Sequence, residues 1–327
     1  MKTSRAYSIF VIVIFFLFML LHQTDKLMIG SMQTPISATF GLNDLQWGLI
    51  NSGALIVATL LYPVWGYLSD RYSRAKLLSL ASLIWGVTTW FSSIVRTYPQ
   101  FLVTRSSTGI DDSSYPGMYS LVADYFSPQL RGKVYGLMQF SQPIGYLVGM
   151  ILALMVAPMI GGWRSVFYIT GSLGILIALV IFFFVKEMPR GKAEPEFEGI
   201  KEFTQIRFSW AAAKEIFKKK TMWFVFLQGF AGVFPWNVIT FFFFGYLQQE
   251  RGYDENAVLM TMAPIIIILA GGYVVGGALG DWLFKRTTKG RIIISSVGVI
   301  MGAIFLFLAL MTPIENRDNF FVFMCLT

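Results

Sequence analysis

The sequence has few of the residues on which enzymes and disulfide-linked proteins depend. Its 327 residues include one cysteine, Cys325, and one histidine, His22, which excludes an internal disulfide, a cysteine-based metal site and a histidine-rich metal centre. Charged residues make up 13% of the chain, against roughly 25% in soluble domains. No nucleophile has a plausible partner base in the sequence, so we predict that the chain is not an enzyme and uses no cofactor.

Apolar residues dominate what is present. Hydrophobic residues make up 55% of the chain, 31 residues are phenylalanine, and the mean hydropathy is +0.62. A membrane core about 30 Å thick needs about 20 apolar residues per helix, and continuous runs of this length exclude a β-barrel. We therefore predict an all-α integral membrane protein, with spans at residues 6–31, 46–68, 76–95, 99–125, 132–157, 164–186, 222–248, 257–283 and 291–312 and a tenth beginning near Asn319.

The basic residues predict the orientation of these spans. Of the 26 lysines and arginines, 20 fall on the side of the N-terminus, and Lys26 and Arg105 lie inside spans. Positive loops stay on the cytoplasmic side, so we expect a cytoplasmic N-terminus in a cell membrane. The net charge of +8 is then a signal of topology and of attraction to anionic lipid, not of nucleic-acid binding.

A short motif occurs twice. Gly66 and Asp70 follow the second span, Gly277 and Asp281 follow the eighth, and in both places Gly-x3-Asp precedes a basic cluster. Such a repeat indicates two parallel bundles related by an axis along the membrane normal. We predict two pseudo-symmetric six-helix bundles.

The domain boundaries follow from this repeat. We predict an N-terminal bundle at residues 1–186, a cytoplasmic linker at 187–220 and a C-terminal bundle at 221–327. The chain ends in an apolar run at Thr327, so we expect a truncated second bundle, with about 9–10 of 12 helices present. The linker is expected to contain an amphipathic helix, lying on the membrane surface or solvated, whose apolar face holds Phe203, Ile206, Trp210, Ala213 and Phe217.

Two motifs resemble the major facilitator superfamily. The segment Gly66–Lys76 is similar to its signature loop between the second and third helices, with Ser73 where the family usually has glycine. The run from Arg105 to Asp111 resembles the helix-four pattern, with Asp111 replacing its last glycine. This resemblance implies a transporter that works by alternating access.

A narrower resemblance is to the Spinster-like branch. It rests on Asp25-Lys26 in the first span and on Gly109-Ile-Asp111-Asp112-Ser-Ser-Tyr115 in the fourth, where that branch has Asp-Arg and Gly-Glu-Ala-Ser-Tyr. The resemblance implies a proton-coupled carrier of an amphipathic anion or zwitterion such as a lysophospholipid. The expected partners are this small-molecule or lipid substrate, the proton and the bilayer, and we expect a monomer.

Five charged residues lie inside predicted spans: Asp25, Lys26, Arg105, Asp111 and Asp112. Each costs about 2.5–3.5 kcal/mol at the bilayer centre unless it is paired or hydrated. A spacing of seven residues returns Arg105 and Asp112 to one helix face. We predict that Asp25 binds the proton while Arg105 pairs in turn with Asp25, Asp112 or a substrate anion, and that Asp111 belongs to the group. The alternative is a static salt-bridge network between the first and fourth helices.

Other polar residues point to a substrate cavity. Pro235 interrupts the seventh span beside polar side chains, as expected where a helix lines a cavity. His22, one turn before Asp25, either relays protons or is a satisfied buried imidazole, and Lys26 either snorkels or binds another helix. We predict that the cavity is lined by His22, Lys26, Gln142, Trp236 and Asn237.

Charges at the cytoplasmic helix ends suggest a gate. Carboxylates there can hold basic groups or helix N-termini across the interface between the bundles. We expect Asp281 with Lys285 to be the counterpart in the second half. The gate motif comprises Gly66, Asp70, Arg71, Arg74, Asp124 and Arg131.

Two other functions stay open. The chain is alternatively an exporter or importer of small organic anions or drugs, although residues 222–248 lack the basic residue that organic-phosphate exchangers carry there. From another class, it is a non-transporting membrane receptor on a transporter fold. Ligand flux into liposomes separates a transporter from a receptor.

Overall fold

The computed structural model describes residues 4–193 and 210–327, and within these ranges every regular element is a helix. The chain divides into two compact units, Met1–Phe244 and Gly245–Thr327. Each unit is described by itself. The predicted bundle boundaries around residues 187–220 stay a prediction.

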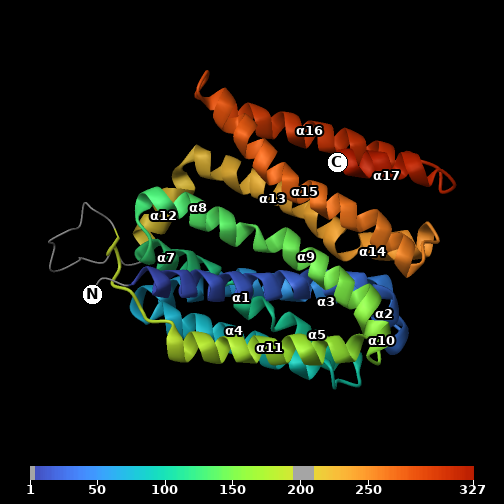
Figure 1. Ribbon diagram of the computed structural model, residues 1–327, viewed down its shortest axis with the longest axis horizontal. Helices are drawn as coiled ribbons and strands as arrows, with labels where there is room; N and C mark the ends of the chain where they lie inside the picture. The colour runs from blue at the N-terminus through green and yellow to red at the C-terminus, as the bar shows by residue number, and fades with distance from the viewer. Residues whose placement is uncertain (1–3, 194–209) are drawn as a thin grey trace. The chain divides into compact units, whose positions relative to one another are not determined.

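The first unit contains most of the helices (Figure 1). Their bounds are α1 Arg5–Ser31, α2 Gln33–Phe40, α3 Asp44–Arg71, α4 Arg74–Ser92, α5 Tyr98–Ser106, α6 Gly109–Asp112, α7 Tyr115–Tyr125, α8 Pro128–Gln139, α9 Ser141–Ile151, α10 Ala157–Met159, α11 Trp163–Phe184, α12 Trp210–Lys218 and α13 Lys220–Phe241.

Two predicted spans are interrupted and one helix was not predicted. The span at 99–125 consists of α5, α6 and α7, and the span at 132–157 consists of α8, α9, a π-helical turn at Leu152–Val156 and α10. Helix α2 follows α1 directly and ends at Gly41, whose φ of +64° suits the left-handed end of a helix.

Glycines set the closest helix contacts of the first unit. A Cβ on Gly145 would lie 2.7 Å from the Leu20 carbonyl, and one on Gly149 would lie 3.1 Å from the Met28 amide and still closer to the Thr24 carbonyl. Helix α9 therefore packs backbone to backbone on α1, because glycines four residues apart lie on one helix face and allow a close approach. Helices α4 and α11 pack together in the same unit (Figure 1). These contacts fix the face of α1 that carries the charged residues.

The second unit is simpler. It contains α15 Glu255–Phe284, α16 Gly290–Met311 and α17 Arg317–Leu326, with α14 Phe243–Gly245 at the boundary and a π-helical turn at Tyr246–Glu250. Helix α16 packs against both α15 and α17. The buried Arg251 guanidinium donates to the Thr312 and Pro313 carbonyls, at 3.2 and 3.1 Å, and so fixes the turn between α16 and α17.

Seven helical stretches among the described residues are long and apolar enough to cross a membrane. None of these seven stretches matches the predicted spans at 76–95 and 99–125 or the span that begins near Asn319. The span at 99–125 is broken into short helices, and α17 has 10 residues.

The predicted amphipathic helix lies largely outside the described residues. Phe203 and Ile206 fall between the two described ranges, and the side chains of Trp210 and Ala213 are not described. Phe217, on α12, is exposed.

Candidate functional site

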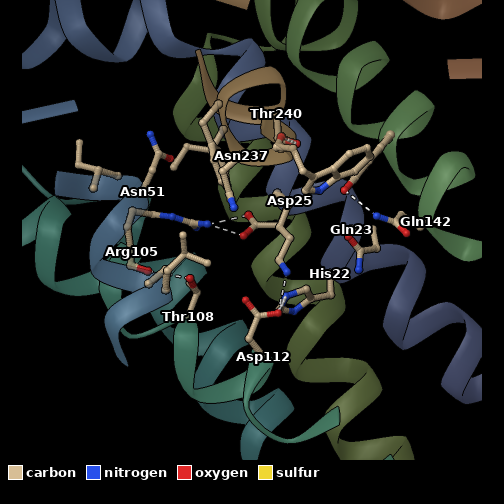
Figure 2. Close-up of a pocket in the computed structure, with 18 residues that line it drawn as sticks. His22, Gln23, Asp25, Asn51, Arg105, Thr108, Asp112, Gln142, Asn237 and Thr240 are labelled. Carbon is tan, nitrogen blue, oxygen red and sulfur yellow. Dashed lines mark hydrogen bonds and ion pairs between the residues drawn. The ribbon is translucent and has the colours of Figure 1, made fainter. Parts of the chain in front are cut away.

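A cavity of about 200 Å³ lies within the first unit. Residues of α1, α3, α5, α6, α9 and α13 line it (Figure 2). The charged residues on its wall are Asp25, Arg105 and Asp112, together with Lys26. The structure also places His22, Gln142, Trp236 and Asn237 on the wall, beside Gln23, Asn51, Tyr146 and Thr240, which the sequence analysis did not single out.

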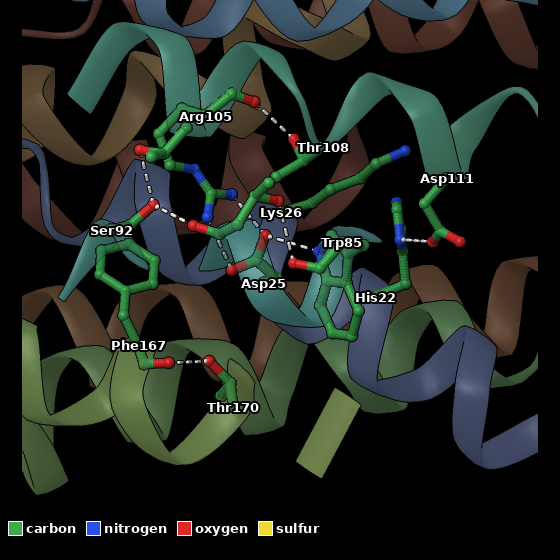
Figure 3. A network of polar contacts seen from close by, with 12 residues as sticks. His22, Asp25, Lys26, Trp85, Ser92, Arg105, Thr108, Asp111, Phe167 and Thr170 are labelled. Carbon is green, nitrogen blue, oxygen red and sulfur yellow. Dashed lines mark hydrogen bonds and ion pairs between the residues drawn. The ribbon is translucent and has the colours of Figure 1, made fainter. Parts of the chain in front are cut away.

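Asp25 and Arg105 form a two-pronged ion pair. Arg105 Nη1 lies 3.3 Å from Asp25 Oδ1, and Nη2 contacts Oδ2. Both residues are buried, and Trp85 Nε1 donates to Asp25 Oδ2 at 3.4 Å (Figure 3). The guanidinium also lies over the Phe167 ring, 5.0 Å from its centroid. The pair therefore satisfies a carboxylate and a cation that would each be costly alone in the membrane.

Asp112 pairs with Lys26 rather than with Arg105. Lys26 Nζ lies 2.7 Å from Asp112 Oδ1, so the lysine binds another helix, one of its two expected positions. His22 Nε2 lies 3.0 Å from the same oxygen, and His22 Nδ1 lies 2.6 Å from Asp111 Oδ2. The embedded charges thus form two groups, in contrast to the single group expected around Arg105.

The course of the fourth helix explains why Arg105 and Asp112 do not share a partner. The amides of Thr108, Asp111 and Ser114 each bond to the carbonyl three residues earlier. Such bonds tighten the helix to about three residues per turn. The turns between Arg105 and Asp112 therefore depart from regular α-helical spacing, which rotates Asp112 relative to Arg105. Both side chains still line the cavity, but they bind different partners.

Aromatic and amide side chains form another part of the cavity wall. Gln142 Nε2 donates to the Tyr146 hydroxyl at 3.0 Å, and the Tyr146 ring stacks on Trp236 with centroids 5.7 Å apart. Asn237 Nδ2 donates to the Val233 carbonyl at 2.8 Å, one turn earlier in α13. The wall therefore combines aromatic faces with amide groups, which suits a ligand with both apolar and polar parts.

Helix α13 meets α1 and α3 at one end of the cavity. The Thr240 carbonyl lies so close to Gly30 that no side chain fits there. Trp47 Nε1, on α3, donates to the Phe241 carbonyl at 3.3 Å. These contacts lie near the C-terminal end of α1, away from its N-terminus.

A second polar cluster surrounds Arg74, at the start of α4. Its Nη1 lies 2.6 Å from Asp124 Oδ2 and its Nη2 lies 2.7 Å from Glu187 Oε1. Nη2 also donates to the Met188 carbonyl at 2.6 Å, and Asp124 Oδ1 accepts the Gly191 amide at 2.7 Å. The cluster ties the segment after α11 to the signature loop. Sequence reasoning missed Glu187 because it lies in the predicted linker.

The other predicted gate residues have different surroundings. Arg131 Nε donates to the Ala123 and Phe126 carbonyls at 3.0 and 3.1 Å, which satisfies the end of α7. Arg71 lies over the Tyr67 ring, 4.2 Å from its centroid. Asp70 is exposed, and Gly66 has open space where a side chain would be.

Asp281 pairs with Arg291, not with the expected Lys285. Arg291 Nη2 lies 2.7 Å from Asp281 Oδ1, and both side chains are 64% exposed. The loop after α15 is short, so the arginine in the first turn of α16 reaches back to α15.

The helical membrane fold and a cavity with paired internal charges define a polytopic membrane protein of the transporter type. The sequence pattern of the Major Facilitator Superfamily matches residues 13–326, and the chain belongs to that family. This is a family of transporters and not of enzymes, in line with the prediction that the chain is not an enzyme. The predicted all-α fold of this family is confirmed, while the division into two six-helix bundles stays a prediction.

Known proteins confirm the Spinster-like resemblance. Protein spinster homolog 1 of Xenopus laevis is 26% identical over 321 residues, which are 93% of this chain and 60% of that protein. Protein spinster of Drosophila melanogaster is 26% identical over 290 residues, 87% of this chain and 47% of that protein. The chain thus spans about three-fifths or less of these relatives.

A solved structure shows the same fold. The crystal structure of a bacterial homolog to the human lysosomal transporter Spinster, in an inward-facing and unoccupied conformation, superposes with a TM-score of 0.80. It is 24% identical, and the match covers 99% of this chain and 72% of the other.

Proposed function

We propose that this chain is a secondary active transporter that works by alternating access and is coupled to protons through Asp25. Its substrate is an amphipathic anion or zwitterion such as a lysophospholipid. The observation that carries the proposal is the buried Asp25–Arg105 ion pair on the cavity wall. The N-terminus is cytoplasmic and the protein resides in the cell membrane as a monomer.

The pair supports coupling because one proton changes its charge. Protonation of Asp25 removes the negative charge that holds Arg105, and an unpaired arginine at membrane depth costs about 2.5–3.5 kcal/mol. An anionic substrate group that takes the place of the carboxylate offsets this cost. Proton binding at Asp25 therefore favours binding of an anion at Arg105, and the linkage is reciprocal.

The rest of the wall supports an amphipathic ligand. Lys26 is already matched by Asp112, so Arg105 is the cation whose partner the proton can neutralise. The stacked rings of Tyr146 and Trp236 offer an apolar face within the same cavity. A lysophospholipid has the required combination of an ionised head group and an apolar tail, and the Spinster-like resemblance points to the same class.

Substrate accumulation under a pH gradient tests this proposal. The wild-type chain and Asp25→Asn are reconstituted into liposomes, and uptake of a fluorescent lysophospholipid is followed with and without an imposed pH gradient. The gradient is expected to accelerate wild-type uptake and to leave Asp25→Asn unaffected. Asp318→Asn, which alters an exposed aspartate on α17, serves as the matched control. An equal response of all three proteins refutes coupling through Asp25.

The cavity size favours small organic anions or drugs as a second candidate. A volume of about 200 Å³ is below the roughly 300–1,000 Å³ of typical ligand pockets. Competition for uptake by short-chain organic anions without a lipid tail distinguishes the two substrate classes. Saturable binding without flux instead indicates a receptor.

A further inference from the structure

His22 and Asp111 form a contact that the proposed function leaves unused. His22 lies on α1 and Asp111 on α6, and their exposed fractions are 2% and 0%. His22 Nδ1 lies 2.6 Å from Asp111 Oδ2 (Figure 3). Apart from this contact, neither oxygen of Asp111 accepts a hydrogen bond from the described residues.

Charge matching singles out Asp111 among the buried carboxylates. Asp25 is held by Arg105, and Asp112 is held by Lys26. Among residues 4–193 and 210–327, the only ion pair of Asp111 is with His22. A fully buried carboxylate without a hydrogen bond or a cation is strongly disfavoured as an anion. Its stability therefore depends on a proton, held either by His22 or by Asp111 itself.

The two ring nitrogens lead to the same conclusion. A neutral imidazole has one N–H and one lone pair. Both nitrogens of His22 face carboxylate oxygens, Nδ1 towards Asp111 and Nε2 towards Asp112 at 3.0 Å. A lone pair pointed at an ionised carboxylate is repulsive, so one more proton is required. It resides on the ring as an imidazolium, or on one carboxyl group.

We propose that His22 and Asp111 form a proton-binding site that is separate from Asp25. Relative to a neutral imidazole beside an ionised carboxylate, this site holds one additional proton. The site deepens the proposed function, on which any role in transport rests.

The surroundings indicate what loss of the proton does. Deprotonation leaves Asp111 and Asp112 with Lys26 as their nearest cation, and the two carboxylates compete for it. Lys26 is 30% exposed and lines the cavity, so a change in its pairing alters the charge that a ligand meets. The titratable and charged groups that face or neighbour His22 are Asp111, Asp112, Lys26, Tyr115, Tyr62, Tyr146 and the Asp25–Arg105 pair.

The chain offers a direct test because His22 is its only histidine. Nitrogen-15 histidine in the full chain, reconstituted in lipid without a histidine tag, gives one pair of ring signals in solid-state NMR. Carbon-13 aspartate in the same sample reports carboxylic acid groups by their infrared carbonyl band. At pH 7 we expect either two protonated ring nitrogens or one protonated nitrogen with a carboxylic acid band. A neutral ring with no carboxylic acid band overturns the proposal, and this outcome needs no variant.

Variants then assign the proton to the site. Asp111→Asn is expected to convert a doubly protonated ring to a singly protonated one, or to abolish the carboxylic acid band. Asp281→Asn, remote from the cavity residues in sequence and exposed, is expected to change neither. Unchanged signals in a folded Asp111→Asn protein refute the assignment. These readouts do not require transport, so a failed transport test of Asp25→Asn leaves this site standing, and a neutral site leaves coupling through Asp25 untouched.

Discussion

Replacing Arg74 by methionine tests whether a buried ion-pair cluster contributes more to stability than an exposed ion pair of the same chemistry. Arg74 is 1% exposed and contacts Asp124, Glu187 and the Met188 carbonyl. Methionine preserves much of the apolar stem but removes every donor, so Asp124, itself 7% exposed, loses its cation. Breaking a buried pair from one side costs about 3–5 kcal/mol. We expect Arg74→Met to lower the free energy of unfolding by this amount, measured by SDS titration in mixed micelles.

The exposed pair provides the scale for this experiment. Arg291 and Asp281 make the same kind of contact at 64% exposure, and such pairs contribute about 0–1 kcal/mol. Arg291→Met should therefore shift the unfolding midpoint little. Glu187 is 34% exposed, so Glu187→Gln should fall between the two. If Arg74→Met costs no more than Arg291→Met, the cluster does not anchor the segment after α11 and the reasoning is refuted.

Three further predictions concern the helix contacts and the cavity. Gly149→Ala places a methyl group 3.1 Å from the Met28 amide and should destabilise the protein by about 1–3 kcal/mol in the same titration. The control Gly132→Ala, whose methyl group has no atom within 4 Å, should be neutral or stabilising. Equal destabilisation by the two substitutions contradicts the packing argument. Trp236→Ala removes the ring that stacks on Tyr146, a contact worth about 0.5–1.5 kcal/mol, and should weaken equilibrium binding of a fluorescent lysophospholipid by roughly 2–10-fold. The control Trp223→Ala, at an exposed position, should leave the affinity unchanged. An unchanged affinity in Trp236→Ala shows that the ligand does not contact this part of the cavity wall. In Gly30→Leu the new side chain collides with the Thr240 carbonyl, and the substitution should abolish liposome uptake while ligand binding persists. Gly229→Leu, on the open side of α13, is the control. Normal uptake by Gly30→Leu shows that transport does not need the close approach of α1 and α13.

The long apolar helices could be read from the sequence because length and hydropathy alone decide them. The observed α1, α11 and α16 begin and end within about two residues of the predicted spans. Helix α2 was missed because it has only eight residues, although Gly41 after it is a typical helix-ending signal. Short helices outside the apolar runs leave little trace in a hydropathy pattern.

The residues of the candidate site were easier to predict from the sequence than the ion pairs that they form. The charged residues inside spans could be named from the sequence because a charge in an apolar run needs a partner or water. Their partners depend on the tightened turns of the fourth helix, which moved Asp112 to Lys26. The partner of Arg74 at Glu187 depends on tertiary contact across more than a hundred residues, which no local pattern encodes.

Proton movement caused by substrate tests the central claim most directly. The wild-type chain, Asp25→Asn and the control Asp318→Asn, which alters an exposed aspartate of α17, are reconstituted in liposomes that contain a pH-sensitive dye, with no pH gradient imposed, and a lysophospholipid is added outside. We expect a change of internal pH with the wild type and with Asp318→Asn, and none with Asp25→Asn. A change of internal pH with Asp25→Asn equal to that of the wild type would contradict proton coupling through the Asp25–Arg105 pair.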